Sequence, residues 1–152
     1  MLQRSQSLFL LGVFILSVLL LTGPLAKFFT EGGELILKHS GVVDAEGVKL
    51  ELATWPLTMI FTVVSALSFL NIFFYRKRIR QMRIAIFTIF LGAGMTGMMF
   101  YYSWVVSSSL HSSHTIYQWR FVLPPVCIIL LFLAFRRIRR DELLVKAYER
   151  IR

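Results

Sequence analysis

Hydrophobic positions along the chain fall into four long blocks, separated by shorter polar or charged segments. The blocks cover about residues 5–22, 56–75, 84–106 and 117–135. Each holds roughly 20 mostly apolar residues, the length that an α-helix needs to cross the hydrocarbon core of a bilayer. The pattern predicts an all-α membrane protein, a four-transmembrane-helix bundle that forms a single integral membrane domain over residues 1–152.

The long polar segment between the first two blocks, residues 23–55, has the alternation of a β-hairpin. Apolar and polar residues alternate cleanly over 48–52 and imperfectly over 34–39, and a turn-rich stretch at 40–47 separates the two parts. This predicts a small extracytoplasmic hairpin between helices 1 and 2. Because a lone hairpin is marginal in water, we expect Val48, Leu50 and Leu52 to rest on the membrane surface, the helix ends or a partner.

The first block also fits a cleaved signal peptide, because Arg4 precedes an apolar core at residues 8–21. Cleavage after Ala26 would place Pro24 at the −3 position, which is unfavourable. We therefore interpret the block as a retained membrane span. Gly23-Pro24 is its predicted end, since a proline disfavours helix in the residue before it.

Positive charges are gathered in three segments. The net charge is +9, and 13 of the 17 Lys and Arg lie in the N-terminus, in the loop between the second and third blocks, or in residues 136–152. Basic segments of this kind stay on the cytoplasmic side. They predict a multi-pass protein of the bacterial inner membrane with both termini in the cytoplasm. We expect anionic lipid headgroups rather than nucleic acid to contact the loop, at Arg76, Lys77, Arg78, Arg80 and Arg83.

Polar side chains form a stripe along the second block at helical spacing. The stripe consists of Thr58, Thr62, Ser65 and Ser68, with Asn71 one turn further on. A stripe of small polar residues favours close helix packing and interhelical hydrogen bonds. A polar path for a substrate is the alternative interpretation.

Glycines in the third block match G-x-G-x-x-G over residues 92–97, but a dinucleotide fingerprint requires a preceding strand and a βαβ unit. We instead expect close helix packing, along one row of small residues at Thr88, Gly92 and Thr96 and a second row that includes Gly97.

The fourth block begins near an arginine and contains two prolines. Arg120 is expected to extend toward lipid headgroups or to pair with an acidic residue of the first loop; the acidic candidates are Glu31, Glu34 and Glu51. Pro124-Pro125 predicts a kink inside the helix.

The basic tail at 136–152 has helical periodicity, with Leu144, Tyr148 and Ile151 on one face. We expect a helix that continues from, or bends off, the fourth span. It would lie on anionic lipid or dock on another membrane protein through Leu144 and Tyr148.

Few residues carry reactive chemistry. No Asp, Glu or His lies inside a predicted span, and Cys127 is the only cysteine, which rules out an internal disulfide. His111 and His114 lack a third ligand nearby, although His39 is predicted on the same side, and we interpret their loop as solvated. We expect no catalytic residues, no cofactor and no metal, and therefore not an enzyme.

Both ends of the chain resemble one family. The opening residues 1–7, Met-Leu-Gln-Arg-Ser-Gln-Ser before an apolar run, are similar to its start, and residues 137–145 and 150–152 to its tail. This is the uncharacterised four-span membrane protein family of the Bacteroidota, domain-of-unknown-function family 4293. Glu149-Arg150 departs mildly from the Asp-Arg pair expected there. The resemblance implies an inner-membrane location and four spans, and no activity or site residues.

Two functions fit this inventory. The first is a non-catalytic accessory or scaffold subunit of a membrane complex, favoured by the packing faces and by two protruding elements that bury little by themselves. The second is a small transporter or lipid-handling protein, which predicts a cavity between helices lined by the polar stripe.

Overall fold

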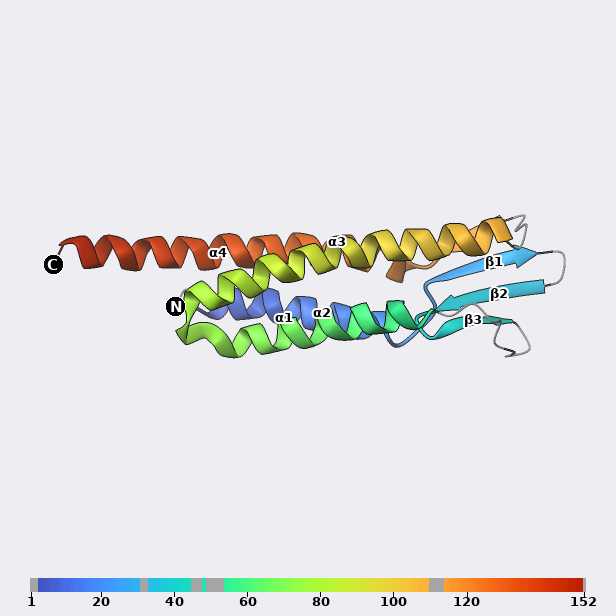
Figure 1. The fold of residues 1–152 in the computed structure, drawn as a ribbon, viewed down its shortest axis with the longest axis horizontal. Helices are drawn as coiled ribbons and strands as arrows, with labels where there is room; N and C mark the ends of the chain where they lie inside the picture. The colour runs from blue at the N-terminus through green and yellow to red at the C-terminus, as the bar shows by residue number, and fades with distance from the viewer. Residues whose placement is uncertain (1–2, 31–32, 45–47, 49–53, 110–113, 152) are drawn as a thin grey trace.

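The computed structural model describes residues 3–30, 33–44, 48, 54–109 and 114–151. Within these residues the chain forms a bundle of α-helices with an antiparallel sheet at one end (Figure 1). The helices are α1 (Gln3–Leu20), α2 (Trp55–Phe73), α3 (Arg78–Ser109) and α4 (Leu123–Ile151), with two short 3-10 helices, η1 (Phe74–Arg76) and η2 (Trp119–Val122). The strands are β1 (Ala26–Thr30), β2 (Gly33–Lys38), β3 (Gly41–Asp44) and β4 (His114–Tyr117).

Three helical segments of the described chain are long and apolar enough to cross a membrane. They are Trp55–Phe73, Arg78–Ser109 and Trp119–Val145. The first predicted span corresponds to α1, whose apolar part, Gln6–Leu20, is shorter. The structure thus supports a membrane protein with several apolar helices, and the crossing by α1 stays a prediction.

The basic segment between α2 and α3 is mostly helical rather than a loop. The 3-10 helix η1 and Lys77 make the whole connection, and α3 begins at Arg78, six residues before the predicted start of the third span. Arg, Gln and Met are good helix formers, so nothing in this segment ends the helix once the turn is made. Three of its five positive charges, at Arg78, Arg80 and Arg83, therefore lie on the first turns of α3.

The element predicted as a lone hairpin between the first two helices is part of a four-stranded sheet with the order β3-β2-β1-β4. β2 pairs with β1, in register from Ala26↔Leu37 to Thr30↔Gly33, as well as with β3. β4 pairs with β1. Its first two residues, His114 and Thr115, were predicted in a solvated loop, and its last, Tyr117, was predicted to open the fourth span but belongs to the strand. The added strands have a physical reason, since two strands alone bury too little surface to be stable.

The predicted hairpin is also shifted along the chain. Its turn lies at His39 and Ser40, between β2 and β3, instead of spanning 40–47. The predicted second strand, 48–52, lies outside the described residues except for Val48, whose carbonyl accepts a hydrogen bond from the Asp44 amide at 3.0 Å. Val48 is exposed. Leu50 and Leu52, predicted with it to rest on the membrane surface, the helix ends or a partner, lie outside the described residues.

α4 is one continuous helix that extends past the other helices at the end opposite the sheet (Figure 1). Pro124 and Pro125 lie in its first turn, so the predicted kink is wrong. The amide groups of a first turn have no intrahelical carbonyl partner, and proline is tolerated there without bending the helix. The tail beyond residue 135 continues α4 instead of bending off.

A single hydrophobic core joins the bundle to the sheet. Strand side chains at Phe28 and Leu37 are fully buried in the same cluster as Phe61 of α2 and Met95 of α3. Along β1 the buried Ala26 and Phe28 alternate with more exposed neighbours, as expected of a strand with one face on a core. The sheet is therefore fixed to the helix ends.

Candidate functional site

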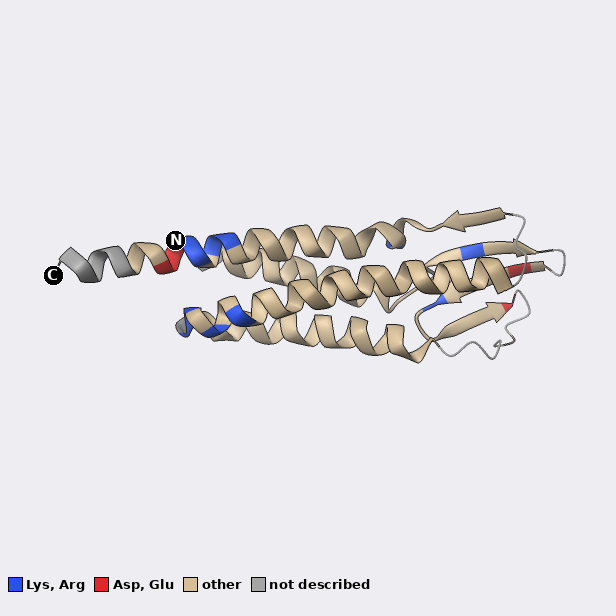
Figure 2. Ribbon diagram, turned by 45° about the horizontal axis from the view of Figure 1, so that its top comes forward, with Lys and Arg blue, Asp and Glu red and all other residues tan. Residues whose placement is uncertain are grey.

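The two ends of the molecule differ in charge. Lys and Arg gather at the end opposite the sheet, on the start of α3 and along α4 (Figure 2). Of the residues predicted to contact lipid headgroups, Lys77, Arg80 and Arg83 are exposed and Arg78 is half-buried, while the side chain of Arg76 lies outside the described part. Both chain termini lie at this basic end (Figure 1).

A buried carboxylate lies inside the basic end. Asp141 of α4 is only 7% exposed, and its Oδ2 accepts a hydrogen bond from the Nε2 of Gln6 in α1. The Nη1 of Arg78, at the start of α3, donates to the backbone carbonyl of Asp141 at 3.1 Å. At Asp141 the predicted tail is therefore packed on the chain's own helices.

Beside this carboxylate, α2 and α3 bury a group of neutral polar side chains. Gln81 donates from Nε2 to the backbone carbonyl of Asn71 at 3.2 Å. The Oγ of Ser68, both side-chain polar atoms of Asn71 and the Oε1 of Gln81 are buried without a hydrogen-bond partner. An unsatisfied buried polar group costs about 1–3 kcal/mol.

The predicted polar stripe of α2 is split between two environments. Ser65 and Asn71 are buried, whereas Thr62 is exposed and Thr58 half-buried near the sheet. The hydroxyl of Thr58 donates to the carbonyl of His39 at 2.8 Å, and that of Thr62 to the carbonyl of Thr58 at 2.8 Å. The stripe is therefore not a continuous polar path.

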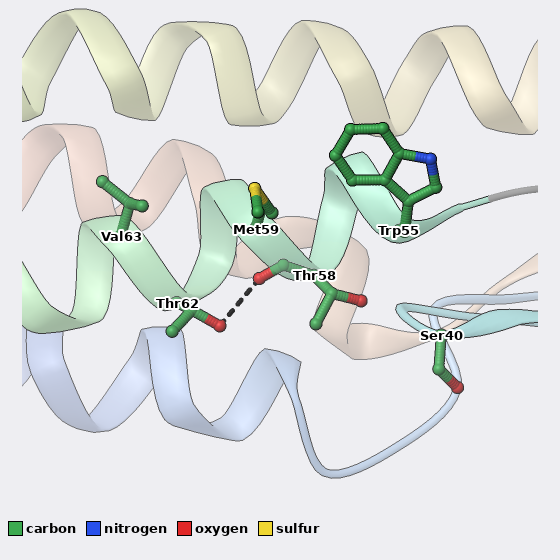
Figure 3. A pocket seen from close by; sticks show the side chains of 6 residues that line it. All are labelled: Ser40, Trp55, Thr58, Met59, Thr62 and Val63. Atoms are coloured by element: carbon green, nitrogen blue, oxygen red, sulfur yellow. Dashed lines mark hydrogen bonds between the residues drawn. The ribbon is translucent and has the colours of Figure 1, made fainter.

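An open groove lies on the sheet end of α2 (Figure 3). Its volume is about 480 Å³, within the range of small-molecule pockets. The lining residues are Ser40, Trp55, Thr58, Met59, Thr62 and Val63. Five of them belong to α2 and the sixth to the β2–β3 turn, so the groove is a surface feature and not the predicted cavity between helices. Because the threonine hydroxyls are bonded to backbone carbonyls, the groove presents mainly apolar atoms.

The residues predicted for helix packing occupy different faces of α3. Thr88 and Gly92 are buried, and a Cβ atom at Gly92 would lie 3.1 Å from Cγ1 of Ile128 in α4. Thr96 is half-buried. Gly97 is exposed, and a Cβ atom there would meet no described atom within 4 Å. Within the described chain, Gly97 is therefore not a packing position.

Arg120 is held at the sheet end of the bundle. It is half-buried, its guanidinium carbon lies 4.9 Å from the centre of the Trp119 ring, and its Nε is buried without a hydrogen-bond partner. The pair with Glu34 is not formed, because the Oε1 of Glu34 lies 2.5 Å from the Nζ of Lys27. Glu31 and Glu51 lie outside the described residues. Gly23, predicted only as a helix end, leaves room for this arginine, because a Cβ atom there would lie 2.5 Å from Cζ of Arg120.

The described histidines do not suggest a metal site. Among the residues that the structure describes, no three His, Cys, Asp or Glu side chains come together. Burial, together with the positive charge of Lys38, lowers the pKa of His39 below its ordinary value of 6.5, and its Nδ1 is buried without a partner. His39 contributes to the structure through its backbone carbonyl, which accepts hydrogen bonds from Thr54 and Thr58 of the α2 start.

Comparison with known families gives one match over nearly the whole chain. Residues 2–151 match the model of the family described as Domain of unknown function (DUF4293). No curated protein matches the chain.

Proposed function

The chain belongs to the DUF4293 family of unknown function, and we propose that it is a non-catalytic accessory or scaffold subunit of a larger complex in the bacterial inner membrane. The observation that carries this proposal is the extension of α4 beyond the bundle. That extension is anchored at its base and exposes apolar side chains beyond it.

The anchor consists of two residues one turn apart on α4. Ile138 is fully buried, and Asp141 is bonded to α1 through Gln6 and to α3 through Arg78. These contacts fix the direction in which α4 leaves the bundle. Anchoring in advance lowers the ordering cost of binding, because the docking helix is already formed and oriented.

Directly after the anchor, three consecutive apolar side chains are exposed. They are Leu143 at 58%, Leu144 at 47% and Val145 at 40%. A run of exposed apolar residues on a helix outside the bundle is unfavourable in water unless another surface covers it. A partner protein that covers this run would remove the apolar surface from water.

Charge supports an orientation with this end in the cytoplasm. Lys and Arg are concentrated at the end that holds both termini (Figure 2), which favours the cytoplasmic side. The 18 residues of α1 are about 27 Å long at 1.5 Å per residue. This is close to the ~30 Å core of a bilayer, so we include α1 as a fourth span.

The test is purification of the tagged full-length protein from its native membrane in mild detergent, with mass spectrometry of the proteins that remain bound. We expect one stoichiometric partner, which is lost when Leu144 and Tyr148 are both replaced by glutamate. Leu144→Met is the matched control, because it keeps the apolar character and volume, and it should retain the partner. A partner that survives the double replacement would show that α4 is not the docking element. Recovery of the protein alone would contradict the subunit proposal.

The groove on α2 favours a second candidate, a lipid-handling protein. Its apolar lining, volume and position at the end of an apolar helix suit an acyl chain. We expect lipid to co-purify with the wild type and to be reduced by Met59→Trp, which would fill the groove with a larger side chain. Val122→Trp is the control, because Val122 is equally exposed but does not line the groove. Equal lipid in all three proteins would exclude this function.

A further inference from the structure

The missing side chain at Gly23 leaves room for the guanidinium of Arg120. A Cβ atom at Gly23, in the segment between α1 and β1, would lie 2.5 Å from Cζ of Arg120 and 2.6 Å from its Nη1. Real Cβ atoms do not approach other atoms so closely, so any other residue at position 23 would displace the arginine. On another side, Trp119 covers the guanidinium with its ring, a favourable cation–π arrangement.

The same guanidinium lacks an anionic partner within the described chain. It carries five N–H donors, and one of them, on Nε, is fully covered without a hydrogen-bond partner. Glu34, the described acidic candidate, is occupied by Lys27. A charge that is partly removed from water without a partner is unfavourable, and an anion bound at the outer nitrogens would compensate for this loss.

The position of Arg120 indicates which anion it would meet. The apolar helical segment that can cross a membrane, made of η2 and most of α4, begins at Trp119, and tryptophan prefers the depth of the lipid headgroups. A planar guanidinium matches the geometry of phosphate oxygens better than an ammonium group does. We propose that Arg120, positioned by Gly23 and Trp119, binds a phosphate group at the sheet end of the bundle, the phosphate of a phospholipid headgroup.

This site is distinct from the basic end, where the proposed partner docks, and from the groove on α2. It would fix the depth of the sheet relative to the bilayer. Gly23 is a positioning residue in this proposal, since it acts only through Arg120.

The test uses the full-length protein in detergent micelles with Trp55→Phe and Trp104→Phe, so that Trp119 is the one remaining tryptophan of the three in the chain. Short-chain phosphatidylglycerol is titrated while the Trp119 emission is recorded. We expect a saturable change, with an apparent affinity that falls about tenfold or more in Arg120→Gln, a loss equivalent to one charge-assisted contact. Arg120→Lys should fall between the two.

Gly23→Ala tests the positioning role. It should weaken binding although the charge is kept, whereas Gly12→Ala should not, because a Cβ at Gly12 makes only an ordinary contact of 3.5 Å. Circular dichroism of each variant shows whether it is folded. If Arg120→Gln fails to fold, Arg120→Lys and Gly23→Ala still decide the question.

Two further titrations identify the source of the phosphate. Diacylglycerol, which lacks a phosphate, should leave the emission unchanged, and an equal response to it would overturn the proposal. Inorganic phosphate should not compete with phosphatidylglycerol if the lipid is the ligand. Competition by inorganic phosphate would overturn the lipid as the source, and unchanged affinity in every variant would overturn the site itself.

Discussion

Close packing of α3 against α4 at Gly92 makes a quantitative prediction. A Cβ atom at this position would lie 3.1 Å from Cγ1 of Ile128 and 3.9 Å from Cδ1 of Leu131. The first distance is too short for an ordinary contact, so Ile128 must shift by a few tenths of an ångström. Overpacking of this kind costs about 1–3 kcal/mol.

Gly97 is the matched control on the same helix. A Cβ atom there would meet no described atom within 4 Å, so Gly97→Ala brings only the helix-propensity gain of about 0.5–1 kcal/mol. Gly92→Ala has the same gain, offset by the overpacking cost. We therefore expect the free energy of unfolding of Gly97→Ala to exceed that of Gly92→Ala by about 1 kcal/mol or more.

The assay is reversible unfolding in mixed micelles with increasing dodecyl sulfate, followed by circular dichroism for wild type and both variants. A second substitution, Ile128→Ala, should remove most of the difference, because it deletes the atom that a Cβ at position 92 would approach. Equal stabilities of Gly92→Ala and Gly97→Ala would refute the packing argument. A difference that persists in the Ile128→Ala background would show that another contact is responsible.

Two further predictions concern the ends of the bundle. Asp141→Ala leaves the buried Gln6 amide without its acceptor, and should lower the free energy of unfolding in the same micelle assay by about 1–3 kcal/mol. Asp141→Asn keeps an acceptor oxygen and should lower the free energy of unfolding by less. Equal losses in the two variants would contradict a role for that hydrogen bond. The pKa of His39 is lowered by burial and then by Lys38, so its contribution to stability is complete above the ordinary pKa of 6.5 and is lost as the pH falls through the lower folded value. Between about pH 7 and pH 5, the midpoint temperature of thermal unfolding should therefore fall more steeply in wild type than in His39→Gln. Identical pH profiles of the two proteins would contradict this role of His39.

Much of the helical architecture could be predicted because hydropathy is a local property. The second and third predicted spans coincide with most of α2 and α3, and the fourth lies largely within α4. Runs of about 20 apolar residues specify such helices whatever their neighbours are. The two ends of the chain were likewise enough to identify the family that residues 2–151 match.

The sheet could be predicted only in part, because strand pairing depends on distant segments. The alternation at residues 34–39 correctly indicated β2. β4 is four residues long and pairs with β1, far away in sequence. Nothing in its local pattern distinguishes it from a loop. The ends of α3 and α4 bring it to the sheet edge, so the fold of the helices decides that this strand forms.

The candidate sites depended still more on tertiary structure. Local spacing could not tell that Gly92 faces α4 while Gly97 is exposed, because helix rotation is set by packing against neighbours. It also could not show that Asp141 is bonded to Gln6, 135 positions away, or that Gly23 makes room for Arg120. The sequence by itself therefore determined which segments are apolar helices and where positive charge gathers. Only the tertiary structure decided which side chains meet, because contacts between distant residues depend on how the elements pack together.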